Sequence, residues 1–233
     1  MKLLVIIAGY HDKICYDYID AVNSTWSQYC NENIQFVTSY GNSQQNILID
    51  NVIHVNKKDL GLNNTYEKAL DVLEVAYHNI DFDIVLRTSL STYFRLDLLY
   101  NVLKTYDAKD FFGSTYDHPL DSGCFAGSTM LLSKDVIKKL LDIRYIDNPS
   151  STWDDTGIEY LLRKIYPNYT DIYKNFKRLD IMENSLVRLE DPLFFINNAN
   201  IWAFRCKTSQ NGVVNRELDI KKMNILHNIF YKR

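Results

Sequence analysis

The sequence predicts an α/β fold: one domain with a mixed, mostly parallel sheet flanked by helices. Strand and helix patterns alternate through the first two thirds of the chain. The first strand is a continuous apolar run, which is typical of a strand that is covered on both faces. No internal repeat, low-complexity tract or linker divides the 233 residues, so a single domain is expected.

The first strand, Leu3–Ala8, ends where Gly9 and polar residues break the apolar run. A helix is predicted over residues 16–29, because apolar residues recur there at helical spacing. The runs Ile34–Tyr40 and Ile49–Val55 predict the second and third strands.

The clearest helix covers residues 63–80, with Asn64 or Thr65 as its cap. Its apolar face consists of Tyr66, Ala69, Leu70, Leu73, Ala76 and Tyr77. The fourth strand, Ile84–Leu86, runs into a polar exit, and a further helix is predicted over Phe94–Tyr106.

The second half predicts shorter elements. Strands are expected within 111–117 and 127–133, helices at Lys134–Ile143 (capped by Ser133), Thr156–Tyr166 and Glu217–Phe230, and β-like patches within 192–198 and 201–207. The chain is more irregular beyond Pro167.

Composition excludes several classes of protein. The net charge of -3, without a basic stripe, argues against a nucleic-acid partner. The four cysteines form no C-x-x-C pair, and the five histidines show no metal spacing. The opening apolar run is too short for a signal peptide, and no run is long enough to span a membrane. A cytoplasmic protein with reduced thiols and no transmembrane segment is therefore expected.

Ligands of open α/β sheets bind beyond the carboxyl ends of the strands, which selects four segments. They are Ala8–Asp12, Val55–Asn64, Arg87–Thr92 and Thr115–Ser128. In the first, Gly9 allows a close backbone approach and Tyr10 offers a ring for stacking on a base. On this segment alone an ordinary turn is the better interpretation, since neither G-x-G-x-x-G nor a P-loop is present.

The second segment is basic. Lys57 and Lys58 follow a strand, and Lys68 lies in the first turns of a helix. A helix N-terminus with a nearby lysine suits a phosphate, but a solvated connection is equally compatible with these residues.

The stretch from Gly61 to Phe94 resembles the nucleotide-sugar half of GT-A-fold glycosyltransferases, whose sheet is Rossmann-like. In the β-1,3-galactosyltransferase-like branch, an "N-L-T-x-K" helix precedes a "D-x-x-x-K/R-T-D-D-D" strand. The matching residues here are Asn64, Thr65, Lys68 and Asp83 to Thr88, then Gly127, Leu132, Ser133 and Asp135, then Asp154, Asp155 and Gly157.

The whole chain also resembles compact glycosyltransferases of large DNA viruses and some bacteria. Their C-terminal segment is matched by Phe204, Arg205, Lys207, Arg216, Asp219, Met223 and Leu226. A viral source would place the protein in the host cytoplasm. The resemblance implies a nucleotide-binding half over residues 1–110 and an acceptor and catalytic half over residues 111–233.

The sequence departs from this family where its members hold a metal. GT-A enzymes typically bind Mn²⁺ or Mg²⁺ through Asp-x-Asp, whereas Ser89-Leu90-Ser91 stands here. Carboxylates suit these hard cations and neutral hydroxyls do not, so dependence on a metal is uncertain.

Three explanations of the departure are open. Asp117, His118 or Asp121 could hold the metal instead. Alternatively, a donor diphosphate could be neutralised by Arg87, Lys68, Arg205 and Lys207. The third explanation is an inactive enzyme. We favour the first two jointly, since an arginine such as Arg87 is rarely buried without a partner.

An acidic pair at a helix start has two interpretations. Backbone N–H groups and the helix dipole favour aspartate there without any catalytic role. The resemblance instead places a general base on this pair, with Asp155 preferred and Asp154 second. Trp153 beside them is either a platform for a sugar ring or part of the core.

The resemblance also implies which other residues bind the donor. It places Ala8, Gly9, Tyr10, Asn64, Lys68, Arg87, Thr88, Ser89, Ser91, Gly127, Arg205 and Lys207 around the nucleotide sugar. The loop Cys124–Ser128 would shape the sugar pocket, although a plain turn also explains it. The basic stretch at 204–207 would close over phosphates, or it would protect an edge strand from aggregation.

The function expected from these observations is transfer of a sugar from a nucleoside-diphosphate donor, expected to be UDP-linked, to a hydroxyl of a glycan or glycoprotein, with inversion. Two alternatives stay open: a non-catalytic protein that binds a nucleotide sugar or a carbohydrate, and another nucleotide-binding α/β enzyme such as a nucleotidyltransferase.

Overall fold

The computed structural model describes residues 1–58, 65–115, 126–146, 153–183, 185–191, 193–209 and 215–231. Its strands are β1 Leu3–Ala8, β2 Ile34–Tyr40, β3 Ile47–Ile49, β4 Val52–His54, β5 Ile84–Ser89, β6 Thr92–Phe94, β7 Phe112–Thr115, β8 Met130–Ser133, β9 Lys174–Phe176, β10 Arg178–Asp180 and β11 Ala203–Arg205. Its helices are α1 Lys13–Ser24, α2 Thr65–Asn79, α3 Leu96–Leu103, α4 Lys134–Ile143, α5 Asp154–Ile165, α6 Tyr169–Ile172, α7 Val187–Glu190, α8 Phe194–Asn197 and α9 Arg216–Tyr231, with a 3₁₀ turn at Trp26–Tyr29.

Among the described residues, the main sheet has eight strands in the order β3-β4-β2-β1-β5-β8-β7-β9. The pairs β4–β2, β2–β1, β1–β5 and β7–β9 are parallel, and the other three pairs are antiparallel. The predicted α/β domain with a mixed, mostly parallel sheet is confirmed. The predicted division into halves at residue 110 stays a prediction.

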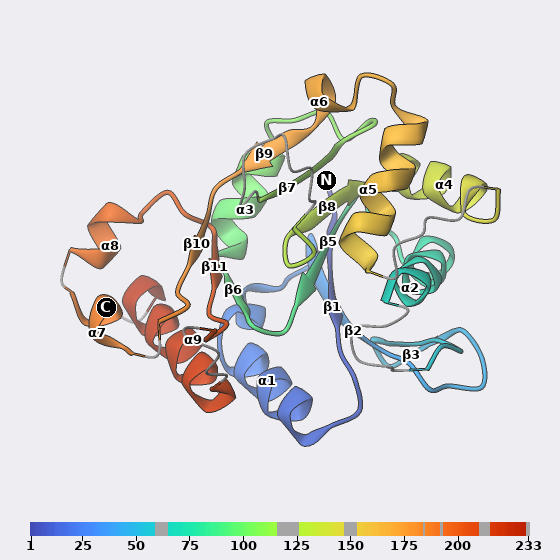
Figure 1. Ribbon diagram of the computed structural model, residues 1–233. Helices are drawn as coiled ribbons and strands as arrows, with labels where there is room; N and C mark the ends of the chain where they lie inside the picture. Colours follow the sequence, from blue (N-terminus) through green and yellow to red (C-terminus); the bar gives the residue numbers. More distant parts are fainter. Residues whose placement is uncertain are drawn as a thin grey trace.

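Helices cover both faces of the sheet, as the apolar run of β1 predicts (Figure 1). Leu3, Val5 and Ile7 of β1 pack into one core with α1, α3 and α9, and the alternate residues Leu4 and Ile6 pack into another with α2, α4 and α5. Successive strand residues point to opposite faces, so one strand supplies both cores.

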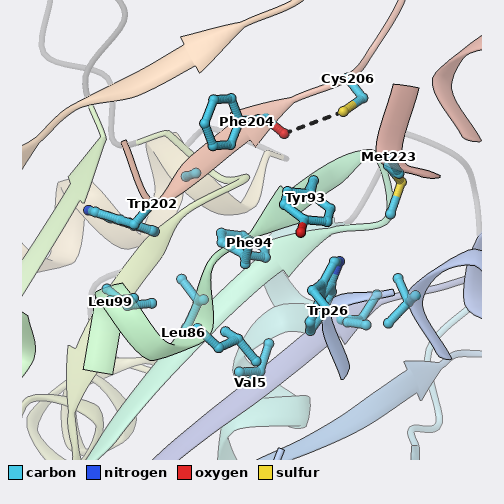
Figure 2. Packing of buried hydrophobic residues seen from close by; sticks show 14 of the residues in the cluster. Val5, Trp26, Leu86, Tyr93, Phe94, Leu99, Trp202, Phe204, Cys206 and Met223 are labelled. Atoms are coloured by element: carbon cyan, nitrogen blue, oxygen red, sulfur yellow. Dashed lines mark hydrogen bonds between the residues drawn. The ribbon is translucent and has the colours of Figure 1, made fainter. Parts of the chain in front are cut away.

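The first core is rich in aromatic side chains (Figure 2). The Trp26 ring stands edge-on to Phe94 with centroids 5.4 Å apart, and Phe94 stacks on Trp202 at 6.0 Å. Trp26 and Phe94 are fully buried, so replacing either with alanine is expected to cost about 3–5 kcal/mol of stability. This packing joins the N-terminal, central and C-terminal parts of the chain.

A smaller sheet brings the C-terminal segment to the end of β5. Its order within the described part of the chain is β10-β11-β6, with β11 antiparallel to β6. A buried polar network then fixes α9: Asp219 accepts hydrogen bonds from the Tyr18 hydroxyl (2.5 Å) and the Thr208 amide (2.6 Å), and Lys222 donates to the Ile181 carbonyl (2.7 Å). Asp219, Met223 and Leu226, which the sequence resemblance singled out, are therefore buried structural residues.

The third predicted strand is wrong in part, because residues 47–54 form a β3–β4 hairpin rather than one strand. Its turn residues Asp50 and Asn51 have φ of 47° and 62°. Aspartate and asparagine tolerate this left-handed conformation, which two-residue hairpin turns require. The Asp-Asn pair was the missed signal.

Two further predictions fail because the outcome depends on distant partners. The helix expected from Phe94 begins at Leu96, and Thr92–Phe94 instead pairs with β11 more than a hundred residues later. Within the β-like patch predicted at 192–198, Phe194–Asn197 forms the helical turn α8, and the Phe194 amide bonds to the Asp191 carbonyl (2.9 Å). β-forming residues make a strand only where another strand lies beside them.

The helix predicted over residues 16–29 begins earlier and ends earlier. Asp12 caps α1 by accepting a hydrogen bond from the Cys15 amide (2.6 Å). The Thr25 hydroxyl donates to the Ala21 carbonyl (2.6 Å) where α1 gives way to the 3₁₀ turn. Ser133 precedes α4 as predicted, but its hydroxyl bonds to the Asp135 carboxylate (2.6 Å) rather than to a helix amide. Within the described residues, no helix is long and apolar enough to cross a bilayer.

Candidate functional site

The carboxyl ends of the central strands meet at one edge of the sheet. In the parallel register, Ala8 of β1 lies between Ser39 of β2 and Ser89 of β5. β8 runs antiparallel to β5, with Met130 opposite Arg87, so the segment that enters β8 reaches the same edge. The predicted segments around Ala8–Asp12, Arg87–Thr92 and Gly127 are therefore brought together.

Residues at the end of β5 form hydrogen bonds with neighbouring segments of the chain. The Thr88 hydroxyl is fully buried and donates to the Ser128 carbonyl at 2.7 Å. The Ser89 hydroxyl lies 3.3 Å from that of Thr92, and the Ser91 carbonyl accepts from the Cys206 amide at 2.8 Å. Thr88 has a structural role, Ser89 is partly exposed at this edge, and Ser91 is buried.

Arg87 connects the strand end to the acidic pair. Its guanidinium forms an ion pair with Asp154 and donates a hydrogen bond to the Gly127 carbonyl. The two charged side chains are 13% and 11% exposed, so the pair is largely shielded from water and from salt screening. Burial raises the pKa of Asp154, and Arg87 opposes that rise. The expectation that Arg87 needs a partner is thus met by Asp154.

Asp155 has a different environment from Asp154. Its Oδ1 accepts a hydrogen bond from the Thr156 amide (2.9 Å), and the residue is partly exposed. A Cβ atom added to Gly127 would lie 3.2 Å from Asp155 Oδ2 and 3.0 Å from an Arg87 nitrogen. Because Gly127 has no side chain, Asp155 and Arg87 can both lie close to its backbone. Asp155 is accessible to a ligand there, whereas Asp154 is buried.

The start of α2 positions the acidic pair. The Thr65 hydroxyl accepts a hydrogen bond from the Asp154 amide (3.1 Å), and the Tyr66 ring packs against Gly157 of α5. α2 and α5 lie side by side on the same face of the sheet (Figure 1). The predicted matches at Thr65 and Gly157 thus explain packing rather than chemistry.

Lys68 forms a hydrogen bond with the backbone at the same edge of the sheet. Its ammonium group donates to the Gly9 carbonyl at 2.7 Å. A Cβ atom on Gly9 would lie 3.0 Å from the Tyr40 ring and 3.1 Å from Cys15 Sγ, so this packing leaves little room for a side chain. Tyr10 follows and is 48% exposed, which leaves its ring available to a ligand.

An aromatic group beside Tyr10 was missed by the sequence reasoning. His11 stacks on Tyr40 with ring centroids 4.7 Å apart, and His11 Nδ1 lies 3.0 Å from the Tyr16 hydroxyl. Tyr16 is 49% exposed. Aromatic faces at a strand end suit the stacking of a nucleobase. The available signal was the set of rings in the two segments that follow β1 and end β2.

A second missed contact fixes the segment before β8. Arg178 on β10 donates to the Ser128 hydroxyl and binds both carboxylate oxygens of Asp180 (2.6 and 3.0 Å). Its side chain is 1% exposed. Gly127 and Ser128 are therefore held by two arginines, Arg87 and Arg178, from different sheets.

Basic residues from the C-terminal segment reach the same strand end. Arg205 lies opposite Thr92 in the β11–β6 ladder, and Lys207 follows two residues later. Burial lowers the pKa of Lys207, and the charges of Arg205 and Arg216 lower it further. Arg216 belonged to the sequence resemblance without an assigned role.

The remaining predicted residues are divided between exposed and undescribed positions. Trp153 is 53% exposed and so is not part of the core. Asn64, Asp117, His118, Asp121 and Cys124 lie outside the described residues. Within the described ranges, no three His, Cys, Asp or Glu side chains are grouped so that they could hold a metal ion.

No protein-family model matches the chain, and no curated protein matches it. Solved structures do. A glycosyltransferase involved in glycosylation of the major capsid of PBCV-1 matches with a TM-score of 0.54 and 9% identity, over 97% of this chain and 100% of that one. The apo-form glycosyltransferase GlyE of Streptococcus pneumoniae TIGR4 matches with a TM-score of 0.54 and 13% identity, over 100% of this chain and 64% of that one. The chain has the fold of these glycosyltransferases.

Proposed function

We propose that the protein is a GT-A-type glycosyltransferase. It moves a sugar from a nucleoside-diphosphate donor, UDP-linked, to a glycan hydroxyl with inversion. The observation that carries the proposal is the convergence of Asp155 and the Arg87–Asp154 ion pair on Gly127, at the strand edge where Tyr10 is exposed. The fold shared with glycosyltransferases supports it.

The donor would lie along the carboxyl edge of the sheet. Its base stacks among the rings of Tyr10, His11 and Tyr16, and its sugar lies toward Gly127. This order places the anomeric carbon near Asp155, because Gly127 is the contact point of that carboxylate. The acceptor enters from the side of the partly exposed Asp155.

The chemical step needs one base and one stabilised leaving group. The acceptor oxygen forms a bond to the anomeric carbon while the bond from that carbon to the diphosphate oxygen breaks, and its electron pair leaves with the diphosphate. The acceptor proton passes to the Asp155 carboxylate. Asp154 stays paired with Arg87 and keeps the guanidinium and the α5 terminus in place.

The test is a screen of UDP- and GDP-sugars for hydrolysis and transfer, with and without Mn²⁺. Asp155→Asn is expected to lower kcat at least about 100-fold, because a general base contributes that much or more, while donor binding changes little. Asp20→Asn, at an exposed position of α1, removes the same charge and serves as the matched control. Full transfer by Asp155→Asn would show that another group is the base.

The serines at 89 and 91 keep a second candidate open, a protein that binds a nucleotide sugar without turning it over. A donor that raises the thermal midpoint but is never hydrolysed or transferred, across a broad acceptor panel, would favour this candidate. If no UDP- or GDP-sugar raises the midpoint with or without Mn²⁺, the nucleotide-sugar proposal is wrong in both forms.

A further inference from the structure

Arg205 emerges beside the hydroxyl groups at the end of β5. It lies directly opposite Thr92 in the antiparallel β11–β6 pair, and opposite residues carry their side chains on the same face, about 5 Å apart. The Thr92 hydroxyl lies 3.3 Å from that of Ser89. A cation thus flanks the strand end that carries Ser89.

Lys207 follows directly after β11. The Cys206 amide donates to the Ser91 carbonyl (2.8 Å), and the Cys206 side chain is fully buried. This bond holds the backbone next to Lys207 against the residue that precedes β6. The charge of Arg205 acts on Lys207, so two cations lie near the strand end.

Arg216 is brought to this pair by Asp219. One oxygen of the Asp219 carboxylate accepts from the Thr208 amide (2.6 Å), next to Lys207, and the other faces Arg216 at 3.0 Å. The Arg216 charge also acts on Tyr10, where it opposes the rise in phenol pKa that burial causes. The charge of Arg216 thus acts on both Lys207 and the exposed ring of Tyr10.

Two carboxylates on this side of the described structure are already engaged. Asp219 is fully buried and shared by Tyr18, Thr208 and Arg216, and Asp180 holds Arg178 through both oxygens. In the described part of the chain, no carboxylate lies within ion-pair distance of Lys207. Burial lowers the pKa of Lys207, Arg205 and Arg216 lower it further, and Asp219 opposes this shift without cancelling it. A bound anion would compensate the positive charge of Lys207.

The described residues at the same edge fit phosphate oxygens better than a divalent cation. Ser89 is partly exposed, whereas Ser91 and Thr92 are buried. The neutral hydroxyl of Ser89 can donate a hydrogen bond to phosphate but is a poor ligand for Mn²⁺ or Mg²⁺. No group of three suitable metal ligands occurs among the described residues. Arginine and lysine, in contrast, form strong charge-assisted bonds with phosphate.

We infer that Arg205, Lys207 and Arg216 form a diphosphate site, which binds the two phosphates of the donor and stabilises the leaving group without a metal ion. The inference rests on the proposed function, because it names the part of the donor that these residues bind. Positive charge placed where negative charge develops lowers the barrier for departure of the diphosphate.

The experiment measures binding of inorganic pyrophosphate, and separately of UDP, by calorimetry in EDTA and in Mn²⁺. Lys207→Ala is compared with wild type and with Lys221→Ala, an exposed lysine on α9 that changes the net charge equally. Lys207→Gln keeps most of the side-chain stem and replaces Lys207→Ala if the latter unfolds. Thermal midpoints of all variants check folding.

Wild type is expected to bind pyrophosphate in EDTA, and Lys207→Ala to bind it at least about 10-fold more weakly, the loss typical of one charge-assisted bond. Lys221→Ala should bind as wild type does. Binding that requires Mn²⁺, or equal binding by Lys207→Ala and wild type, would overturn the inference.

These outcomes are independent of those that test the transferase. Donor turnover that requires Mn²⁺ and tolerates Lys207→Ala would leave the transferase standing and remove the diphosphate site. Pyrophosphate binding that is lost in Lys207→Ala, in a protein that turns over no nucleotide sugar, would support the anion site and reject the transferase.

Discussion

Gly157→Ala tests the contact that joins the acidic helix to its neighbour. Gly157 lies in α5, and a Cβ atom there would be 2.3 Å from Tyr66 Cδ2 and 2.8 Å from Cγ. Carbon atoms in contact are separated by about 3.5–4.0 Å, so α5 or the Tyr66 ring must move by about 1 Å or more. Tyr66 is buried on α2 and has little room to move.

The two physical effects of this substitution have opposite signs. Alanine is favoured over glycine in a helix by about 1 kcal/mol. Overpacking of a well-packed site costs about 1–3 kcal/mol, and the severity of this clash places it near 3. The expected net loss is about 2 kcal/mol, which for a chain of this size lowers the thermal midpoint by about 4–8 °C.

The assay is urea and thermal unfolding of Gly157→Ala, Tyr66→Leu and the double variant. If the clash is the cause, Tyr66→Leu should remove most of the additional cost of Gly157→Ala, because the two sites are in contact and their effects are not additive. A Gly157→Ala protein that is about 1 kcal/mol more stable than wild type would refute the reasoning, since helix propensity alone would then explain the result.

Two more predictions concern stability. Arg144 is buried and paired with Asp71, so Arg144→Ala leaves a buried carboxylate uncompensated and should cost about 3 kcal/mol in urea unfolding, whereas Lys138→Ala, which breaks an exposed pair, should cost less than about 0.5. Burial raises the pKa of Tyr40 to about 12 from the model-compound value of 10.0; the folded state therefore holds its proton longer than the unfolded state, and stability should fall from about pH 10 to 12. Tyr40→Phe should flatten that fall; an unchanged pH profile would count against a neutral, buried phenol.

Local patterns predicted most of the elements. Apolar patterns predicted β1, β2, β5, α2, α4 and α9. A strand buried on both faces or an amphipathic helix has a recognisable pattern of apolar residues within about a dozen residues. The predicted strand Ile49–Val55 contains β4, but β3 and the turn between the two strands were missed. That turn has positive φ at Asp50 and Asn51, which the periodicity of the flanking residues does not indicate. β6 was missed because its partner strand β11 lies more than a hundred residues later in the sequence. α8 was missed because β-forming residue types form a strand only where another strand lies beside them.

The candidate site was predicted unevenly. Arg87, Asp154, Asp155 and Gly127 were named from the sequence, and they do converge on one surface. The different environments of Asp154 and Asp155 were not visible, because the two residues are adjacent and chemically identical. Burial and the contact with Arg87 distinguish them, and both depend on how α5 packs against β5 and α2.

The sequence by itself determined the α/β class, the strand order along the chain and the residue types that stand at each strand end, since these depend on local pattern and composition. Only the tertiary structure decided that the segment with Arg205 and Lys207 lies beside β6, and that Asp219 brings Arg216 to this segment. That arrangement needs β11 to pair with β6 and Tyr18 of α1 to hold Asp219 of α9, two contacts between residues far apart in the chain. Long-range pairing is set by the packing of the whole core, which no short window of residues contains.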